Sequence, residues 1–329
     1  MADYFRPIVS REGHGLRLAG GMCRFSQVEY IRRDGPRRII PALELPKDVV
    51  QRLTSPRPPI CGIAMDHPSV MGILNLTPDS FSDGGAHRGV EVEAAKAMLA
   101  SGADLLDIGG ESTRPGADYI AVDEEMRRVL PVIEALHGQG LGPLSIDTRK
   151  AAVAKAALGA GAVLFNDVTA LAFDPDSLGV AAKSGAALCL MHAKGLPETM
   201  QDNPEYGDVL LEVYDYLEAR LQACEAAGIA RSRIMVDPGI GFGKTTAHNL
   251  ALLRGISLFH GLGCAILLGV SRKGMIGEIA NEPAPERRFA GSIALGLEGL
   301  NQGVQMLRVH DIAETRQAIA LWSALKAEG

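Results

Sequence analysis

From residue 70 onward, short apolar runs alternate with Ala- and Leu-rich stretches of helical length. Eight of these runs have the length of strands, and they span Val70–Thr77, Ala103–Gly110, Pro143–Thr148, Ala162–Val168, Ala186–His192, Arg233–Gly239, Ala265–Ser271 and Gln305–Asp311. Expected helices include Val90–Ser101, Asp123–His137, Arg149–Leu158, Tyr206–Ala227 and Glu286–Leu300. The apolar runs are nearly continuous, as parallel strands covered on both faces should be. Eight βα units in roughly 250 residues predict an α/β fold, a (β/α)8 TIM barrel, over residues 70–329.

Polar residues lie at or beside the end of every expected strand, which favours the barrel over an open, doubly wound sheet. One polar strand end carries little information, because each strand has to leave the core. Together they indicate a site, because reactive side chains of a TIM barrel lie where strands end and βα loops begin. The stretches that contain them are residues 75–85, residues 107–116, Asp147, residues 166–167, residues 191–192, Asp237, residues 271–273 and residues 308–311.

Residues 1–69 differ from the rest of the chain in pattern and in charge. They contain 11 Lys and Arg against 7 Asp and Glu, a balance of +4, so the remainder carries −10. Strands are predicted at Cys23–Ser26, Val28–Arg33 and Arg37–Ile40. Asp34–Gly35 predicts a hairpin turn, Pro36 confines the last strand to a sheet edge, and residues 55–59 resemble a linker. We therefore expect a small N-terminal β appendage that packs on the barrel or on a partner subunit.

The overall composition excludes several classes of protein. Hydrophobic residues make up 47% and charged residues 22%, which is ordinary for a soluble globular protein. The net charge of −6 argues against nucleic acid as a partner. Apolar stretches are too short for a membrane span, and the N-terminus lacks the apolar core of a signal peptide. The five cysteines are odd in number and scattered, without a Cys-x-x-Cys pair, which fits a reducing cytoplasm.

Asp237 opens the run Asp-Pro-Gly-Ile-Gly-Phe-Gly-Lys, which ends at Lys244. A strand that ends in a carboxylate and opens into a glycine-rich turn places an acid at the mouth of a pocket, and the glycines let the backbone approach a flat ligand. The run imitates a phosphate-binding loop, but the first glycine of that motif would fall at Pro238, so the match fails. Lys244 is therefore assigned no chemistry.

The strand-end residues form two chemical sets. Asp147, Asn166, Asp237 and Lys273 offer acceptors and donors that could bracket a polar heterocycle. Arg308 and His310 alternate along one strand and so face the same way, and with Asn75 they could bind a doubly charged group such as pyrophosphate. Asn75 could also reach Mg²⁺, which takes few protein ligands. His192 and His310 lack the clustering of a zinc site.

Two long βα loops have the composition of loops that close over a site and exclude water. They are rich in Pro, Gly and small polar residues, and they span Asp79–Gly85 and Ser112–Gly116. Plain surface turns are the alternative.

These motifs resemble those of the dihydropteroate synthases, the folate-pathway members of the pterin-binding TIM-barrel family. The similarity extends from residue 70 to about residue 325. The segments that carry it are Met71–Gly85, Gly109–Ala117, Ser145–Thr148, Asn166–Val168, Asp237–Lys244, Ser271–Lys273 and Arg308–Asp311. They occur in the family's order and at expected strand ends, which makes the resemblance specific.

The resemblance implies a transferase that condenses 6-hydroxymethyl-7,8-dihydropterin diphosphate with 4-aminobenzoate to give 7,8-dihydropteroate and pyrophosphate. Its catalytic residues would be Asp147, Lys273, Asp83 and Arg308. The pterin would be held by Asp147, Asn166, Asp237 and Lys273, with Met191, Gly241, Phe242 and Val309 among the lining residues. The family also suggests a homodimer.

The same resemblance assigns roles at the mouth of the site. Arg308 would lie along the pterin and, with His310 and Asn75, bind the diphosphate together with Mg²⁺. Other residues would close over the site or receive the aminobenzoate carboxylate, and these are Thr113, Arg114, Asp83 and Ser271. The favoured mechanism is dissociative: pyrophosphate leaves first, the pterin methylene becomes a delocalised cation, and the arylamine then attacks.

Two alternatives stay open at this point. A pterin-dependent methyltransferase would share the pterin-binding acids but would have no need of Arg308 and His310 for a diphosphate. A non-catalytic homologue would bind a pterin or support a partner enzyme. Loss of Asn75, Arg114, Lys273 or His310 would signal such a homologue, and all four are present.

Overall fold

The computed structural model describes residues 3–10, 13–76, 88–114 and 116–326, and the side chain of Arg88 lies outside that description. Eight parallel strands form a closed barrel in the order β10-β11-β12-β5-β6-β7-β8-β9, so strands that follow one another in the chain lie side by side. The predicted TIM barrel is therefore confirmed. The barrel strands are β5 (Ser69–Asn75), β6 (Leu105–Gly109), β7 (Leu144–Asp147), β8 (Leu164–Asp167), β9 (Ala187–Met191), β10 (Ile234–Asp237), β11 (Ala265–Leu268) and β12 (Met306–Val309).

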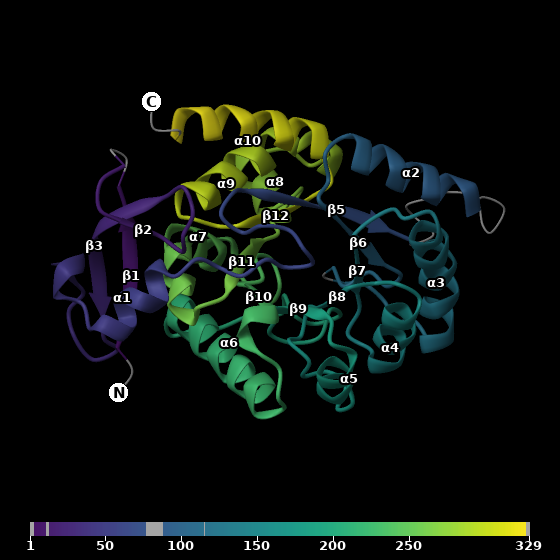
Figure 1. Ribbon diagram of the computed structural model, residues 1–329, viewed down its shortest axis with the longest axis horizontal. Coiled ribbons are helices and arrows are strands. Elements are labelled where there is room, and N and C mark those ends of the chain that lie inside the picture. The colour runs from purple at the N-terminus through teal and green to yellow at the C-terminus, as the bar shows by residue number, and fades with distance from the viewer. Residues whose placement is uncertain (1–2, 11–12, 77–87, 115, 327–329) are drawn as a thin grey trace.

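Helices surround the strands as an outer ring, which Figure 1 shows from one end of the barrel. They are α2 (Arg88–Ala100), α3 (Val122–Gly138), α4 (Ala151–Gly159), α5 (Ser177–Ser184), α6 (Val209–Ala226), α7 (Thr246–Arg254), α8 (Gly274–Ala280), α9 (Phe289–Asn301) and α10 (Ile312–Lys326). Short 3-10 turns are η3 (Arg231–Arg233), η4 (Ile256–Leu262) and η5 (Pro285–Arg287). Helix α6 begins later than the expected Tyr206, because Asp208 caps it by accepting from the amides of Leu210 and Leu211.

Alternate residues of each barrel strand face the helices and the barrel interior. In β6, Leu106 and Ile108 belong to the large apolar cluster under the helices, whereas Leu105 belongs to a separate cluster inside the barrel. Asp107 lies between the two helix-facing residues and therefore points inward. The same alternation puts Leu307 of β12 under the helices and Met306 inside.

The strand register brings polar strand ends to one level at the carboxyl end of the barrel. Asn75 pairs with Gly109, Gly109 pairs with Asp147, and Asp147 pairs with Asn166. On the other side of the barrel, Asp237 pairs with Met191. Side chains that lie up to 162 residues apart in the chain, from Asn75 to Asp237, therefore meet around one opening.

A short segment closes the amino end of the barrel. Ile60 and Met65 are buried in the interior cluster together with the first residues of several strands, including Leu105 and Leu164. An isolated bridge between Ile60 and Ile63 shapes the segment. The chain crosses the barrel here on its way from α1 (Lys47–Thr54) to β5 (Figure 1).

The N-terminal region forms an antiparallel sheet, as expected, with more strands than the sequence predicted. Its strands are β1 (Tyr4–Val9), β2 (Leu16–Arg17), β3 (Arg24–Ile31) and β4 (Arg38–Pro41), and the turn η1 (Ala42–Glu44) follows them. The two strands expected at 23–26 and 28–33 are one continuous strand, β3. Strands β3 and β4 form the predicted hairpin, and β4 pairs with β3 alone.

This sheet packs against the side of the barrel. Phe25 is fully buried in the cluster that also underlies the barrel helices, and the hydroxyl of Ser257 in η4 donates to the Pro7 carbonyl at 2.8 Å. Ion pairs add to the contact, because Arg37 lies 3.1 Å from Asp208 and Arg33 pairs with Asp215. The expected linker is anchored rather than free: Arg57 is buried and donates to the His260 carbonyl at 2.9 Å.

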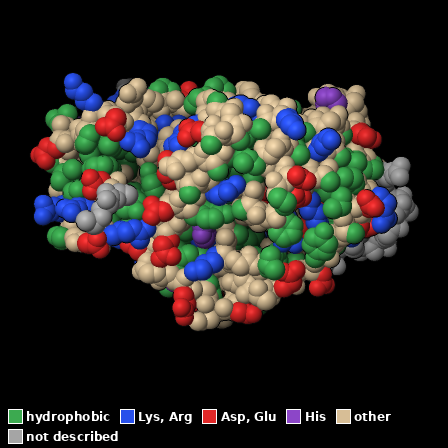
Figure 2. Space-filling view, turned by 90° about the horizontal axis from the view of Figure 1, so that it is seen from below, with side chains coloured by type: hydrophobic (Ala, Val, Ile, Leu, Met, Phe, Trp, Pro, Cys, Tyr) green, Lys and Arg blue, Asp and Glu red, His purple; other side chains and the backbone are tan. Residues whose placement is uncertain are grey.

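The surface carries side chains of both charges. Figure 2 shows one face on which cationic and anionic side chains are interspersed. Among the described residues, no helix is both long and apolar enough to cross a membrane. The five cysteines are all unpaired.

Candidate active site

At the carboxyl end of the barrel, an arginine side chain lies between two buried carboxylates. The Arg308 guanidinium donates from Nε to Asp107 at 2.6 Å and from Nη2 to Asp147 at 2.7 Å. Asn166 donates from Nδ2 to the same Asp107 carboxylate at 3.0 Å. Asp107 therefore fixes both Arg308 and Asn166, and it ties together β6, β8 and β12.

Both carboxylates keep an oxygen that no described residue satisfies. Oδ1 of Asp107 and Oδ1 of Asp147 are buried and have no hydrogen-bond partner. Burial raises the pKa of Asp147 to about 7, although the Arg308 charge opposes this shift. Unpaired buried acceptors are costly, so their presence at the carboxyl end of the barrel indicates a ligand that donates hydrogen bonds there.

Asp237 and Lys273 face this pair from across the opening. Asp237 is buried at the end of β10, where its Oδ1 accepts from the Gly239 amide at 2.7 Å. The Lys273 ammonium lies 4.1 Å from the centre of the Phe242 ring. Burial lowers the pKa of Lys273 to about 7, while the negative charge of Asp237 acts in the opposite direction.

The glycine-rich turn after β10 requires its glycines. Gly239 has a φ of +69°, and a Cβ there would lie 1.9 Å from the His192 carbonyl oxygen. Gly241 has a φ of +83°, and a Cβ there would meet the Lys273 side chain at 3.3 Å. The turn can therefore approach both its neighbours only because these side chains are absent.

Lys244 holds this turn in place. Its buried ammonium donates to the carbonyls of Gly239, Phe242 and His192 at 2.8, 3.0 and 3.2 Å. The same nitrogen lies 2.9 Å from His192 Nδ1, and burial together with the Lys244 charge lowers the pKa of His192 to about 2. Lys244 thus joins the end of β9 to the turn after β10. This role is structural and was not predicted from the sequence.

Apolar side chains form a cluster beside that turn. Met191 and Phe242 form a small buried cluster with Val168 and Met200. The cluster places flat and polarisable surfaces next to Lys273, which suits an aromatic or conjugated ligand.

A second group of polar residues lies at the rim. His310 Nδ1 lies 2.9 Å from the Ser271 hydroxyl, and its Nε2 lies 3.3 Å from Arg114 Nη2. Burial and the neighbouring arginines lower the pKa of His310 to about 3, so its ring is neutral at physiological pH. Thr113 precedes Arg114 in the same loop and is half-buried.

Asn75 ends β5 next to Gly109 and is the metal ligand predicted from the sequence. Within residues 3–10, 13–76, 88–114 and 116–326, no three His, Cys, Asp or Glu side chains form a metal cluster. An amide oxygen as the main protein ligand fits a hard cation that keeps its waters and does not fit zinc. Asp83, the predicted residue of the first loop, lies outside the described residues.

The chain matches the family model of pterin binding enzymes over residues 71–310. The chain belongs to this family of pterin-binding enzymes. The match runs from the third residue of β5 to just beyond β12, so it includes every described residue of the site.

Dihydropteroate synthases are among the most similar relatives of this family member. The enzyme of Escherichia coli strain K12 is 44% identical over 262 residues, which cover 79% of this chain and 92% of the relative. The enzyme of Neisseria meningitidis serogroup B is 47% identical over 270 residues, covering 80% and 94%.

Solved structures of the family show the same similarity. The Xanthomonas albilineans dihydropteroate synthase with 4-aminobenzoic acid has a TM-score of 0.78 at 47% identity, covering 84% of this chain and all of that one. The same enzyme in complex with 7,8-dihydropteroate has a TM-score of 0.75 at 44% identity, covering 83% of this chain.

This pterin-binding fold brings most of the predicted site residues together, and it turns one side chain away from them. The side chain of Val309 is buried in the cluster under the helices, on the opposite face of β12 from Arg308 and His310. A contact between Val309 and a substrate, as predicted, would therefore have to come from its backbone. The reason is the two-residue alternation of a strand.

Asp107 was not predicted as a site residue, although it joins Arg308 to Asn166. It belongs to the polar stretch that ends the second expected strand, but its position in the middle of β6 gives no sign of a ligand role. The signal that could have identified it is a carboxylate that alternates with Leu106 and Ile108 and hence faces the barrel interior.

Proposed function

We propose that the protein catalyses the dihydropteroate synthase reaction: it condenses 6-hydroxymethyl-7,8-dihydropterin diphosphate with 4-aminobenzoate to give 7,8-dihydropteroate and pyrophosphate. The single observation that carries the proposal is the set of buried carboxylates at one barrel end, with unpaired Oδ1 atoms on Asp107 and Asp147. The high identity to dihydropteroate synthases over most of the chain supports it.

The pterin ring occupies the deep part of the pocket in this proposal. The unpaired oxygen of Asp147 and the carboxylate of Asp237 accept from the ring N–H and amino groups, and Asn166 adds a donor or an acceptor. Lys273 donates to acceptors on the ring, and the Phe242 face and Met191 line the flat sides. The low pKa of Lys273, about 7, makes a neutral amine accessible near physiological pH.

The diphosphate lies toward Arg308 and His310. Asn75 would hold Mg²⁺ through its amide oxygen, with diphosphate oxygens and waters as further ligands. When bound, Mg²⁺ supplies positive charge that makes the diphosphate a better leaving group. Arg308 contributes charge from the protein side, and its two carboxylate partners fix the guanidinium in place.

The chemistry that fits this site is a dissociative substitution at the pterin methylene. The bond from this carbon to the diphosphate oxygen breaks, and its electrons leave with pyrophosphate. Asp147 stabilises the resulting delocalised cation through its negative charge. The amine nitrogen of 4-aminobenzoate then forms the new C–N bond and loses a proton to water.

The rim positions the second substrate. Ser271 would accept the carboxylate end of 4-aminobenzoate by donating its hydroxyl, and Arg114 and Thr113 would cover the arylamine. Arg114 already contacts His310, so a loop residue and a strand-end residue meet where the two substrates would join. Asp83 would act from the first loop.

We also propose a homodimer in the cytoplasm. Helices α8, α9 and α10 expose the large apolar side chains Ile279, Phe289, Leu321 and Leu325, and such surfaces are typical of subunit interfaces. The unpaired cysteines fit a reducing compartment.

Mixing the purified protein with the pterin diphosphate, Mg²⁺ and 4-aminobenzoate tests the proposed function. Pyrophosphate release that depends on 4-aminobenzoate is the expected result. Tight pterin binding without release would point to a non-catalytic homologue. Methyl transfer to or from a pterin without use of 4-aminobenzoate would point to a methyltransferase.

A further inference from the structure

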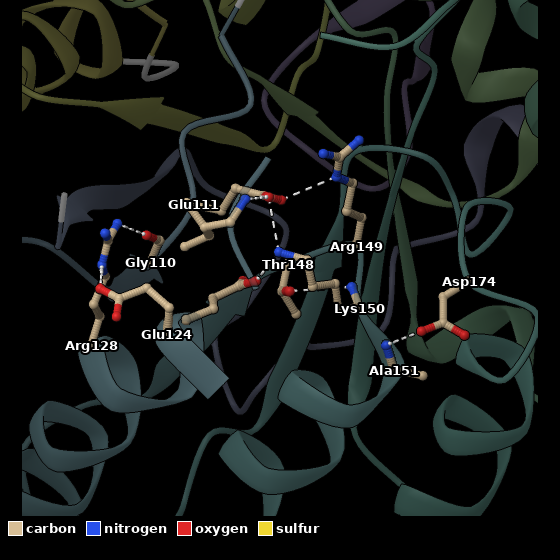
Figure 3. A network of polar contacts seen from close by, with 11 residues as sticks. Gly110, Glu111, Glu124, Arg128, Thr148, Arg149, Lys150, Ala151 and Asp174 are labelled. Carbon is tan, nitrogen blue, oxygen red and sulfur yellow. Dashed lines mark hydrogen bonds and ion pairs between the residues drawn. The ribbon is translucent and has the colours of Figure 1, made fainter. Parts of the chain in front are cut away.

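A buried ion network lies directly behind the loop that carries Thr113 and Arg114. Its centre is Glu111, the second residue after β6, whose carboxylate accepts from Arg149 Nε at 3.0 Å and from Lys150 Nζ at 2.8 Å. Figure 3 shows the three side chains converging from the loop after β6 and from the start of α4. The proposed reaction uses none of them.

The network is electrically balanced, although Oε1 of Glu125 is buried without a hydrogen-bond partner in the described part of the chain. Lys150 also donates to Glu125 of α3 at 2.7 Å, so two carboxylates face two cations. All four side chains are at most 3% exposed. Charges this deeply buried are tolerated only when they are paired, so loss of any member leaves an uncompensated partner.

The far end of the same loop also binds to Glu111. The Ile120 amide donates to Glu111 Oε1 at 3.1 Å. The ring of Tyr119 lies over the Lys150 ammonium, 4.4 Å from the ring centre. Glu111 thus joins the two ends of a single loop, and the cations from α4 fix that junction against the barrel.

Two further hydrogen bonds hold the loop, one on each side of Arg114. Arg128 of α3 donates to the Gly110 carbonyl at 2.9 Å (Figure 3). Further on, the Gly116 amide donates to the Pro197 carbonyl at 2.8 Å. Arg114 lies between these anchors and reaches His310 at the rim.

We propose that Glu111, held by Arg149 and Lys150, is a positioning residue that sets the place of Arg114 over the 4-aminobenzoate end of the site. The inference rests on the proposed function and deepens it. Glu111 itself touches neither substrate, because its carboxylate is enclosed by the loop and α4. Its influence on the reaction passes through the loop.

The chain offers a matched control for this role. Glu125 binds the same Lys150 and is equally buried, but it belongs to α3, and among the described residues its carboxylate accepts no hydrogen bond from the loop backbone. Glu111→Gln and Glu125→Gln both remove one carboxylate charge from one network. Only the first weakens the junction of the loop ends.

Steady-state kinetics of the full-length protein with both substrates and Mg²⁺ provide the test. We expect Glu111→Gln to lower kcat/KM for 4-aminobenzoate by about 10- to 100-fold. The dissociation constant of the pterin diphosphate, measured by calorimetric titration, should change by less than about twofold, because Asp147 and Asp237 hold it independently. Glu125→Gln should lower the unfolding temperature as Glu111→Gln does but leave kcat/KM for 4-aminobenzoate within about twofold.

A second variant serves if Glu111→Gln does not fold. Tyr119→Ala removes the ring over Lys150 and leaves all four ions in place, and it should lower kcat/KM for 4-aminobenzoate in the same direction. The inference would be overturned if Glu111→Gln and Glu125→Gln lowered kcat/KM for 4-aminobenzoate equally and weakened pterin diphosphate binding to the same extent. Unchanged kcat/KM for 4-aminobenzoate in Tyr119→Ala would also overturn it. Absence of aminobenzoate-dependent pyrophosphate release from the unmodified protein would contradict the proposed function itself.

Discussion

Lys273 combines three features that single residues of this protein rarely share. It follows a barrel strand, lies over an aromatic ring and carries a pKa lowered to about 7. Its place opposite Asp147 and Asp237 makes it the donor at the polar end of the pocket.

Replacing Lys273 with Ala should therefore reduce product formation by at least about 100-fold, because a preorganised donor in an enclosed site is lost. Product is measured as dihydropteroate formed at saturating substrates. Lys194→Ala is a matched control, since the Lys194 ammonium also lies over an aromatic ring, Tyr206, at 4.3 Å but is exposed outside the proposed site. Near-normal turnover in Lys273→Ala would contradict the assigned role.

The same lysine gives a prediction about pH and stability. Folded Lys273 releases its proton near pH 7, whereas in the unfolded chain it keeps the proton up to the ordinary pKa of 10.5. The unfolded state therefore binds more protons between these values, and stability should rise with pH across that window. The free energy of unfolding of the unmodified protein, relative to Lys273→Met, should increase by up to about 1 kcal/mol per pH unit. Urea denaturation of both proteins at several pH values checks this. If their free energies of unfolding changed in parallel with pH, the prediction would be refuted.

Residue-level prediction from sequence succeeded where chemistry coincides with a strand end. Asp147, Asn166, Asp237 and Arg308 follow apolar runs, and the parallel arrangement brings such ends together. Asp107 was not predicted, because its role depends on which way a residue in mid-strand points. Partners such as Glu111 and Lys150 lie 39 positions apart and meet only through the packing of α4 beside the loop.

At the scale of elements, the turn after β10 depends on close approach of its backbone to the end of β9. Gly239→Ala should destabilise the protein by about 2–4 kcal/mol, because a Cβ would collide with the His192 carbonyl in addition to the strain of a positive φ. Gly228→Ala has the same strain, with a φ of +82°, but open space around the new Cβ.

The free energies of unfolding of the two glycine variants distinguish the collision with His192 from the strain of a positive φ. Gly228→Ala should cost only about 1 kcal/mol. Equal losses of stability would show that the contact with His192 contributes nothing. Pterin binding should weaken in Gly239→Ala alone, since Gly241 and Phe242 lie in the same turn.

The strands themselves were the most predictable elements, because runs such as Ala265–Ser271 are apolar on both faces and have strand length. The ends of the strands were harder to predict: β11 stops at Leu268, three residues before the predicted end at Ser271. Strand β1 was not predicted, since Tyr4–Val9 is short, contains Pro7 and lies near the terminus. Its pairing with β3 comes from tertiary contact with η4, which local pattern does not reveal.

For the whole molecule, the N-terminal sheet should matter for stability more than for turnover. Phe25→Ala should cost about 3–5 kcal/mol, because the ring is fully buried between the sheet and the barrel helices. Phe5→Ala is the control, since Phe5 is partly buried and stacks on Tyr30 at 5.2 Å, so we expect about 1 kcal/mol.

Both phenylalanine variants should keep the kcat of the unmodified protein while folded. The reason is that the polar contacts of the sheet named above lead to α6, its cap Asp208 and η4, which carry none of the proposed site residues. Chemical denaturation and turnover measured on the same samples check the two statements. A large fall in kcat for Phe25→Ala would give the sheet a direct part in the chemistry.

The closed amino end of the barrel has a consequence for the order in which ligands bind and leave. Ile60 and Met65 fill the interior at the amino end, so a ligand reaches the proposed site from the carboxyl end. In the proposed arrangement both substrates use this one entrance, so the pterin, which lies deeper, enters before 4-aminobenzoate covers it at the rim. Dihydropteroate has to withdraw its pterin end last, and until it does so the next pterin diphosphate has to wait.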